Sequence, residues 1–285
     1  MFAKTKSRAA INSPLRYAGG KFYARKLIWE HMPAHNYYCE PFAGGASIFF
    51  AKAKSAKSHL NDLDKDLIRV FRFIRDKPEE LIGFLKNLSA SKELHHYYKN
   101  EFKPKTQLER AGRWYYLNRT SYSGIMNMPN CYWGYGDKYS MQPKNWPASI
   151  RGCSRKLQGV KLTSLDFEKV INSLPDGAFA FVDPPYFNAD QDKFYTCAFT
   201  REDHFRLERT LYENRDRLLI FLTYDNSEEI RNLYSWAAEI HDKEWNYCIN
   251  RTDDQINRTA RRGNRYKGKE VFILNYKSNG NGLLF

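Results

Sequence analysis

Short apolar runs that alternate with segments of helical spacing constrain the fold of this chain more than any other feature. Residues 37–53 predict a strand, a glycine-containing turn and a helix, and residues 58–64 predict a second strand that ends in acids. Residues 67–74 follow with apolar side chains at helical spacing. Strands that alternate with helices are typical of an α/β fold with a mostly parallel sheet.

The second half of the chain repeats the alternation. After the strand signals "VKLTSLD" and "AFAFVD", residues 201–216 predict a helix, with Thr200 and Asp203 placed as a capping box. Residues 218–226 predict another strand, after which Ser227 can cap a helix. The last two strands, "AAEIHDKEW" and "EVFILNY", are joined without a helix and should be antiparallel. The sheet should contain about seven strands.

The middle of the chain interrupts this pattern. Pro78 is placed to open a helix, but residues 90–150 are rich in Tyr, Trp, Asn, Lys and Gly and have no sustained period. We expect one helix at 107–118 and otherwise a long functional loop region. The predicted organisation is a catalytic domain of residues 1–68 and 151–285, with an insert at 69–150.

Charge and composition point to a polyanionic partner. The 285 residues carry a formal net charge of +14, which favours nucleic acid, and 16% are aromatic and could stack on exposed bases. The five cysteines are scattered, never as C-x-x-C, which argues against a disulfide framework or a zinc site. With no apolar stretch near about 18 residues and no secretory signal, we expect a cytoplasmic protein that does not span a membrane.

The stretch "FAFVDPPYFN" stops a buried strand on an acid and two prolines. Pro184 and Pro185 cannot donate to a ladder, so Asp183 should lie at the carboxyl end of the strand, where ligands bind in open α/β sheets. The Asp183 carboxylate and the Pro184 carbonyl can both accept hydrogen bonds from an exocyclic amine, which would make its nitrogen nucleophilic. Tyr186 offers a face for a planar ring. A proline turn without function would explain the prolines but not Asp183 and Tyr186 together.

Two earlier motifs favour a nucleoside cofactor. "EPFAGGAS" at 40–47 is a turn that a ligand can approach closely, or simply a tight strand-to-helix connection. "NDLD" ends the next strand with acids that can accept from ribose hydroxyls, or that are merely solvated. The spacing of turn and acid favours an adenosine-type ligand. Because the turn lacks the full G-x-G-x-x-G, we expect a mononucleoside rather than a dinucleotide.

The order of the motifs resembles a known family. "RYAGGK", "EPFAGGAS", "NDLDKDL", "LNRTSYSGI", "DPPY", "LTYDN" and "KEVFILNY" occur in the order found in Dam-like, D12 class N6-adenine DNA methyltransferases, with the alpha arrangement of motifs. The resemblance implies a Rossmann-like class I methyltransferase fold with an inserted, mostly helical or loop target-recognition domain at 69–150. It implies S-adenosylmethionine as cofactor. It also implies direct in-line transfer to N6 of an adenine flipped out of duplex DNA, without a covalent intermediate or a metal.

The resemblance also implies site residues. Tyr17 and Lys21 would contact the cofactor, Lys21 near its carboxylate, while Asp62 would hold the ribose and Asp166 the adenine amine. Asp183 and Tyr186 would grip the target adenine. The implied catalytic set is Asp183, Pro184, Pro185 and Tyr186, and the implied cofactor-binding set is Tyr17, Ala18, Gly19, Lys21, Glu40, Phe42, Gly44, Asp62, Asp166 and Asp183.

The same resemblance assigns DNA contacts within the insert. Arg119 would touch the DNA backbone, Tyr122 would wedge into the duplex, and Ile125 would contact bases. Family members that read GATC carry an arginine where this chain has Asn127, so GATC is not implied, and Arg16 remains a candidate base reader. The basic stretch 250–269 is either a solvated loop or a phosphate contact. The implied DNA-binding set is Arg16, Arg119, Tyr122, Ile125, Asn127, Arg261 and Arg262.

Other functions stay open at this point. An RNA adenine methyltransferase could share the fold, and a catalytically idle DNA-binding regulator would be expected to have lost the DPPY residues. A protein glutamine methyltransferase usually carries Asn in place of Asp183 and does not need the charge of +14. We expect a monomer that binds double-stranded DNA in a prokaryotic or phage-infected cell, with a restriction endonuclease as a potential partner.

Overall fold

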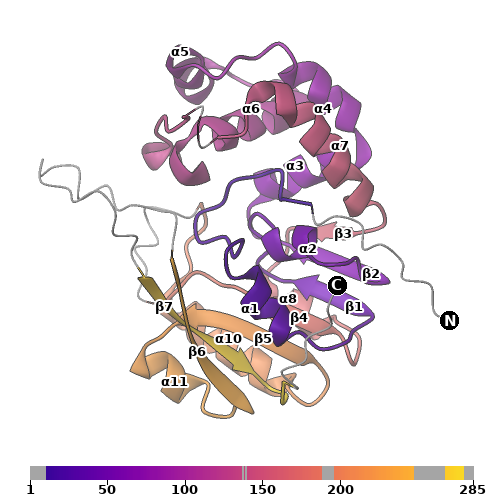
Figure 1. Cartoon of the computed structure of the whole chain (residues 1–285), viewed down its shortest axis with the longest axis vertical. Helices are drawn as coiled ribbons and strands as arrows, with labels where there is room; N and C mark the ends of the chain where they lie inside the picture. The colour runs from indigo at the N-terminus through magenta and orange to yellow at the C-terminus, as the bar shows by residue number, and fades with distance from the viewer. Residues whose placement is uncertain (1–10, 137, 139, 188–195, 247–266, 279–285) are drawn as a thin grey trace, which may run out of the picture.

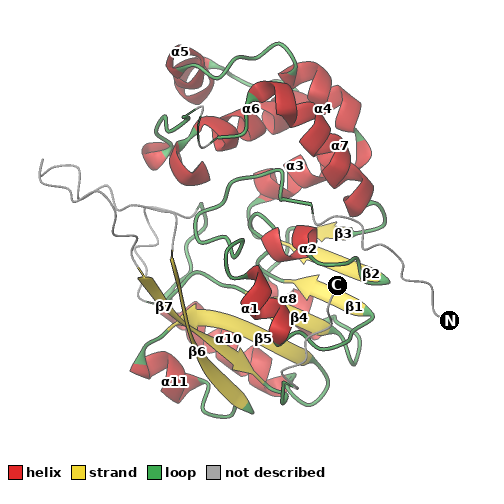
Figure 2. Ribbon diagram, viewed as in Figure 1, coloured by secondary structure: helices red, strands yellow, loops and turns green. Residues whose placement is uncertain are grey.

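A seven-stranded mixed sheet is the centre of the molecule (Figure 2). The computed structural model describes residues 11–136, 138, 140–187, 196–246 and 267–278. The strand order is β3-β2-β1-β4-β5-β7-β6. The strands are β1 (Tyr37–Glu40), β2 (Lys57–Asn61), β3 (Lys161–Thr163), β4 (Phe179–Val182), β5 (Leu219–Asp225), β6 (Glu239–Asn246) and β7 (Lys267–Leu274).

The strand directions confirm the predicted α/β sheet. Strands β1 to β5 run parallel, whereas β7 lies antiparallel between β5 and β6. Because β6 and β7 are consecutive and joined without a helix, they pair as an antiparallel hairpin. In parallel strands the carboxyl ends meet at one edge, so the acids that follow β1, β2 and β4 are brought to the same side of the sheet.

Alternating side chains along the strands fill two cores. In β4, Phe179 and Phe181 face the first core, while Ala180 and Val182 face the second. Helices α1 (Arg25–Glu30) and α2 (Ser47–Ala51) cover the first face, and α8 (Phe167–Asn172), α10 (Arg201–Glu213) and α11 (Glu228–Leu233) cover the second. A strand that is apolar on both faces requires such cover on both sides.

Local signals placed several helix ends as expected. The side-chain oxygens of Thr200 and Ser227 accept from the backbone N–H groups of Asp203 and Ile230, and Thr200 and Asp203 form a complete capping box. Pro78 occupies the first turn of its helix, where its missing N–H costs nothing.

The insert is mostly helical. Within residues 90–150, where one helix at 107–118 and otherwise a long loop were expected, further helices occur at 92–101 and from residue 146. Figure 1 shows these helices gathered at one end of the molecule, at the top of the view, with the sheet below. They are α3 (Lys65–Asp76), α4 (Pro78–Leu85), α5 (Lys92–His96), the π-helix η1 (Tyr97–Glu101), α6 (Gln107–Thr120) and α7 (Trp146–Leu157), with short 3₁₀ turns η2 (Tyr122–Gly124), η3 (Met128–Asn130) and η4 (Pro143–Asn145).

Helix α7 accounts for much of the error. Trp146, Ile150, Cys153 and Leu157 recur at helical spacing and are all buried in the first core. The adjacent Pro147 suggests a loop, but proline is tolerated in the first turn of a helix. The helical layer spans residues 65–157, between β2 and β3, and shares the first core with the sheet.

The sequence argued against a disulfide framework and against a membrane-spanning segment. In the described part of the chain, Cys39, Cys131, Cys153 and Cys197 are free thiols. Among the same residues, no helix has the length and apolar character that crossing a bilayer requires.

Candidate active site

A single pocket collects the residues that the sequence analysis assigned to the cofactor and to catalysis. It has a volume of about 370 Å³ and lies at the carboxyl ends of β1, β2 and β4, as expected for an open α/β sheet. Its lining includes every member of both sets: Tyr17, Ala18, Gly19, Lys21, Glu40, Phe42, Gly44, Asp62, Asp166, Asp183, Pro184, Pro185 and Tyr186. The structure therefore brings the two sets together, while their individual roles remain predictions.

The turn after β1 needs glycine for two separate reasons. Gly44 has φ +45°, in the left-handed region that favours glycine. A Cβ added there would also lie 2.8 Å from Cε1 of Tyr17, whose ring packs against the turn. This close approach joins the "RYAGGK" segment to the "EPFAGGAS" segment and forms one wall of the pocket.

Asp62 ties the turn to the end of β2. Its Oδ2 accepts from the Gly44 N–H at 2.9 Å and its Oδ1 accepts from the Asp64 N–H at 3.0 Å. Burial raises the pKa of Asp62 to about 6, against the lowering effect of these two backbone hydrogen bonds. The carboxylate is thus held in a fixed orientation at the pocket, with remaining lone pairs for a hydroxyl donor.

Glu40 is buried at the end of β1 and is committed to the protein on one oxygen. Its Oε1 accepts from the Tyr38 hydroxyl at 2.6 Å and from the Phe49 N–H at 2.9 Å, which links β1 to α2. Burial raises the pKa of Glu40 to about 8. Glu40 therefore holds the turn between β1 and α2 in place.

Asp166 is held by an arginine that the sequence analysis missed. Arg206 donates from its two terminal nitrogens to Oδ1 and Oδ2 of Asp166 at 2.8 and 2.9 Å, a bidentate ion pair. Asp166 also caps α8 by accepting from the Glu168 N–H at 3.0 Å. Its pKa is lowered chiefly by the hydrogen bonds from Arg206. The carboxylate at the pocket is therefore charged and rigidly oriented.

Asp183 is held by two donors on the same oxygen. Thr223, on the neighbouring strand β5, donates its hydroxyl to Asp183 Oδ1 at 2.6 Å. The Lys21 ammonium lies 2.7 Å from the same oxygen and also donates to the Gly19 carbonyl at 3.0 Å. Asp183 Oδ2 accepts no hydrogen bond from the residues that the structure describes, and the side chain is 20% exposed at the pocket.

The prolines and a second acid fix the chain beyond Asp183. Pro184 is buried. Two residues beyond Pro185, the Phe187 N–H donates to Asp225 Oδ1 at 2.9 Å. The Lys21 ammonium lies 4.9 Å from the centre of the Tyr186 ring, on its face. The Lys21 ammonium thus contacts Asp183 and Tyr186, and its contact with a cofactor carboxylate remains a prediction.

A buried acid behind Lys21 was not predicted. Glu270, on β7, is 1% exposed, and its Oε2 lies 3.9 Å from the Lys21 ammonium. Burial raises the pKa of Glu270 to about 8, and Lys21 opposes this rise. The Lys21 ammonium lies closer to Asp183 than to Glu270, at 2.7 Å against 3.9 Å. Its sequence signal was an acid just before the apolar run "VFIL".

Comparison with known proteins identifies the family. A model of the D12 class N6 adenine-specific DNA methyltransferases matches residues 17–249, which include the whole pocket. The chain belongs to this family.

Curated relatives agree with this assignment over most of their length. The type II methyltransferase M1.LlaDCHI of Lactococcus lactis subsp. cremoris is 27% identical over 95% of this chain and 98% of its own. The type II methyltransferase M.CviBI of Paramecium bursaria Chlorella virus NC1A is 26% identical over 86% of this chain and 96% of its own. The DNA adenine methylase of Escherichia coli K12 is 24% identical over 80% and 85%. This chain is an adenine-specific DNA methyltransferase.

In this methyltransferase the predicted recognition segment is joined to the pocket. The segment crosses back on itself through a β-bridge between Ser121 and Trp133. The buried side chain of Asn118 holds this segment against the turn that contains Arg16. It accepts from the Arg16 N–H at 2.9 Å and donates to the Arg16 carbonyl at 2.7 Å. A Cβ on Gly124 would lie 2.4 Å from that same carbonyl oxygen.

The predicted DNA contacts divide into three groups. Tyr122 and Asn127 are half-buried, and Arg16 donates to the Ser121 carbonyl at 3.2 Å and the Ser140 hydroxyl at 3.4 Å. Arg119 and Ile125 are only 5% and 7% exposed, and their contacts with DNA remain predictions. Arg119 donates to the Pro14 carbonyl at 3.5 Å. The third group, Arg261 and Arg262, lies outside the described residues.

Proposed function

We propose that this methyltransferase transfers a methyl group from S-adenosylmethionine directly to N6 of an adenine flipped out of duplex DNA, by in-line attack and without a covalent intermediate. When bound, S-adenosylmethionine would supply a methyl group on a positively charged sulfur. The pocket suits it in three respects: its volume of about 370 Å³, the Gly44 turn that a Cβ would close, and the oriented acids Asp62 and Asp166. These features support Asp62 as the ribose acceptor and Asp166 as the acceptor of the adenine amine.

The position of Asp183 is the observation that carries the catalytic proposal. Thr223 and Lys21 both engage Oδ1, so Oδ2 is left toward the pocket to accept an N–H of the target amine. The Pro184 carbonyl would accept the other N–H. Two acceptors draw the nitrogen lone pair out of conjugation with the purine ring, and fixed acceptors cost no reorganisation during the reaction.

Access to these acceptors explains the proposal of base flipping. Asp183 lies at the pocket with its side chain only 20% exposed, so we propose that the target adenine leaves the helix to reach it. Tyr122 is the side chain we propose to fill the space that the base vacates. We further propose that the helical layer 65–157 is the DNA-recognition unit, with the chain's charge of +14 supporting phosphate contact.

The test is Asp183→Ala, assayed with labelled S-adenosylmethionine on adenine-unmethylated duplex DNA and, separately, on RNA. We expect methyl transfer to be abolished while DNA affinity stays within about twofold, because Asp183 contributes to the reacting centre and not to phosphate binding. Asp176→Ala is the matched control, since its carboxylate is 85% exposed and lies outside the pocket. Near-normal turnover of Asp183→Ala would overturn the proposed role of Asp183 as an acceptor for the target amine. Preferential methylation of RNA would overturn the proposal that duplex DNA is the substrate.

Two of the relatives are named type II methyltransferases. We therefore propose that this protein acts beside a restriction endonuclease that reads the same DNA sequence. Sequencing of modified adenines in DNA from cells that express the chain would identify the recognition sequence. GATC is not implied, because Asn127 stands where family members that read GATC carry an arginine. A monomer is sufficient for the proposed reaction, since one chain supplies all the residues of the pocket.

A further inference from the structure

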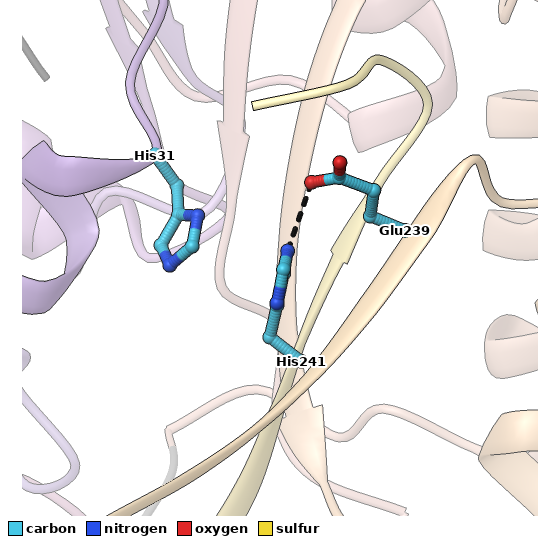
Figure 3. Close-up of side chains that lie close together, drawn as sticks. All are labelled: His31, Glu239 and His241. Carbon is cyan, nitrogen blue, oxygen red and sulfur yellow. Dashed lines mark hydrogen bonds and ion pairs between the residues drawn. The ribbon is translucent and has the colours of Figure 1, made fainter. Parts of the chain in front are cut away.

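A cluster of side chains that could hold a metal ion lies outside the pocket. His31 follows the C-terminus of α1, while Glu239 and His241 belong to the edge strand β6 (Figure 3). One potential ligand atom from each lies within 4.8 Å of the others. The two imidazole rings have their centroids 4.4 Å apart, and His241 Nε2 lies 2.9 Å from Glu239 Oε2.

The fold holds these three residues in place. Glu239 and His241 are two apart in a strand, so they point to the same face of the sheet. On that face, the Tyr276 hydroxyl donates to the His31 carbonyl at 2.9 Å and anchors the end of α1. Ser278 donates from both its N–H and its hydroxyl to Glu239 Oε2, at 3.0 and 2.7 Å, and its hydroxyl also lies 2.9 Å from His31 Nδ1. The carboxylate is thus oriented toward both rings before any ion binds.

We propose that His31, Glu239 and His241 form a binding site for a divalent transition-metal ion of the Zn²⁺ type, with water as the fourth ligand. Two imidazole nitrogens and one carboxylate are a set that suits zinc, whereas Mg²⁺ and Ca²⁺ prefer oxygen ligands throughout. Ligand atoms about 2.1 Å from a tetrahedral ion lie roughly 3.4 Å apart. Because no two of the three ligand atoms are more than 4.8 Å apart, shifts of at most about 0.8 Å for each side chain would close the site.

Two neighbouring residues act on the proposed site in opposite directions. Ser278 would become the outer partner of the site, because it orients the Glu239 carboxylate. Lys243 opposes the ion, because its positive charge lies two residues further along the same face of β6.

The bound ion would act as a clip between distant parts of the chain. It would join the end of α1 to the edge strand β6, at the side of the sheet opposite to β3. Helix α1 follows directly after the turn that carries Lys21, so the clip would stabilise the segment that leads into the active site. No catalytic step is assigned to the ion, and the site is independent of the proposed methyl-transfer mechanism.

The experiment measures binding of Zn²⁺ alone to the full chain after treatment with a chelator. We expect one equivalent to bind by calorimetry, to raise Tm with increasing Zn²⁺, and to be replaced by Co²⁺ with the visible absorption of a tetrahedral complex. His31→Ala and His241→Ala should each weaken binding by at least about tenfold, because loss of even an outer partner commonly costs that much. Lys243→Gln should strengthen it.

Two controls separate this site from others. His96 and Glu101 form an exposed pair, with His96 Nδ1 3.3 Å from Glu101 Oε1. Among the described residues they belong to no group of three potential ligands, so His96→Ala should leave Zn²⁺ affinity unchanged. Cys197→Ser tests binding to the partly exposed thiol. Tm without metal checks that the His31 and His241 variants fold. Absence of stoichiometric binding, or equal affinity in wild type, His31→Ala and His241→Ala, would overturn the proposal.

Discussion

Replacing Thr223 by valine tests how Asp183 is positioned. Thr223 is fully buried on β5, and its hydroxyl donates to Asp183 Oδ1 at 2.6 Å. Valine keeps the β-branched shape that suits a strand but replaces the hydroxyl by a methyl group. The substitution therefore removes one of the two donors that hold Oδ1, while Lys21 stays 2.7 Å from the same oxygen.

The size of the effect follows from that single hydrogen bond. A hydrogen bond to a charged group is worth about 1.5–3 kcal/mol. Each 1.4 kcal/mol of transition-state stabilisation corresponds to about tenfold in rate, so complete loss of positioning would lower kcat/KM by roughly 10- to 150-fold. Because Lys21 still holds the carboxylate, we expect a loss near about tenfold. Affinity for S-adenosylmethionine should not change, since Thr223 does not line the pocket.

The assay is methyl transfer to adenine-unmethylated genomic DNA under single-turnover conditions, with cofactor affinity measured by calorimetry. Thr210→Val is the matched control, because Thr210 is also buried but its hydroxyl donates to the Arg206 backbone carbonyl, within α10, at 2.7 Å. A Thr223→Val enzyme within about twofold of wild type, or a loss equal to that of Thr210→Val, would refute the positioning argument.

Three further outcomes are expected. Gly44→Ala should lower the free energy of unfolding by about 1–2 kcal/mol and weaken cofactor binding, because it places a Cβ at φ +45° against Tyr17. Thermal unfolding should show no such loss for the control Gly83→Ala, where a Cβ meets open space. Cofactor affinity should fall as pH drops through about 6, because Asp62 is then protonated and loses acceptor capacity. Calorimetry should show that this pH dependence disappears in Asp62→Asn. If the affinity of that variant still fell with pH, Asp62 would not be the ribose acceptor. Tyr122→Ala should reduce base extrusion, followed with a fluorescent adenine analogue, more than cofactor binding; equal losses would indicate a folding role.

Local patterns in the sequence were enough to predict the sheet, and the resemblance to the family implied most of the pocket. Hydrophobic period, turn glycines and capping residues act within a few positions of one another, and these determine where strands and helices begin and end. Acids that follow parallel strands meet at one edge of the sheet, so Asp62 and Asp183 could be placed together without coordinates. The same reasoning failed for α7, where Pro147 outweighed an apolar spacing that was present in the sequence.

Pairings across the chain depended on the tertiary structure. The Lys21 ammonium contacts Asp183 and lies near Glu270 because the order of strands places β4, β5 and β7 side by side, which no local pattern encodes. The same holds for His31 beside Glu239 and His241: only packing of α1 against the edge of the sheet brings them within reach. The burial of Arg119 and its hydrogen bond to the Pro14 carbonyl also depend on packing, whereas its contact with DNA stays a prediction. Short-range periodicity specifies the elements, whereas the partners of each charged group are specified by which elements pack together.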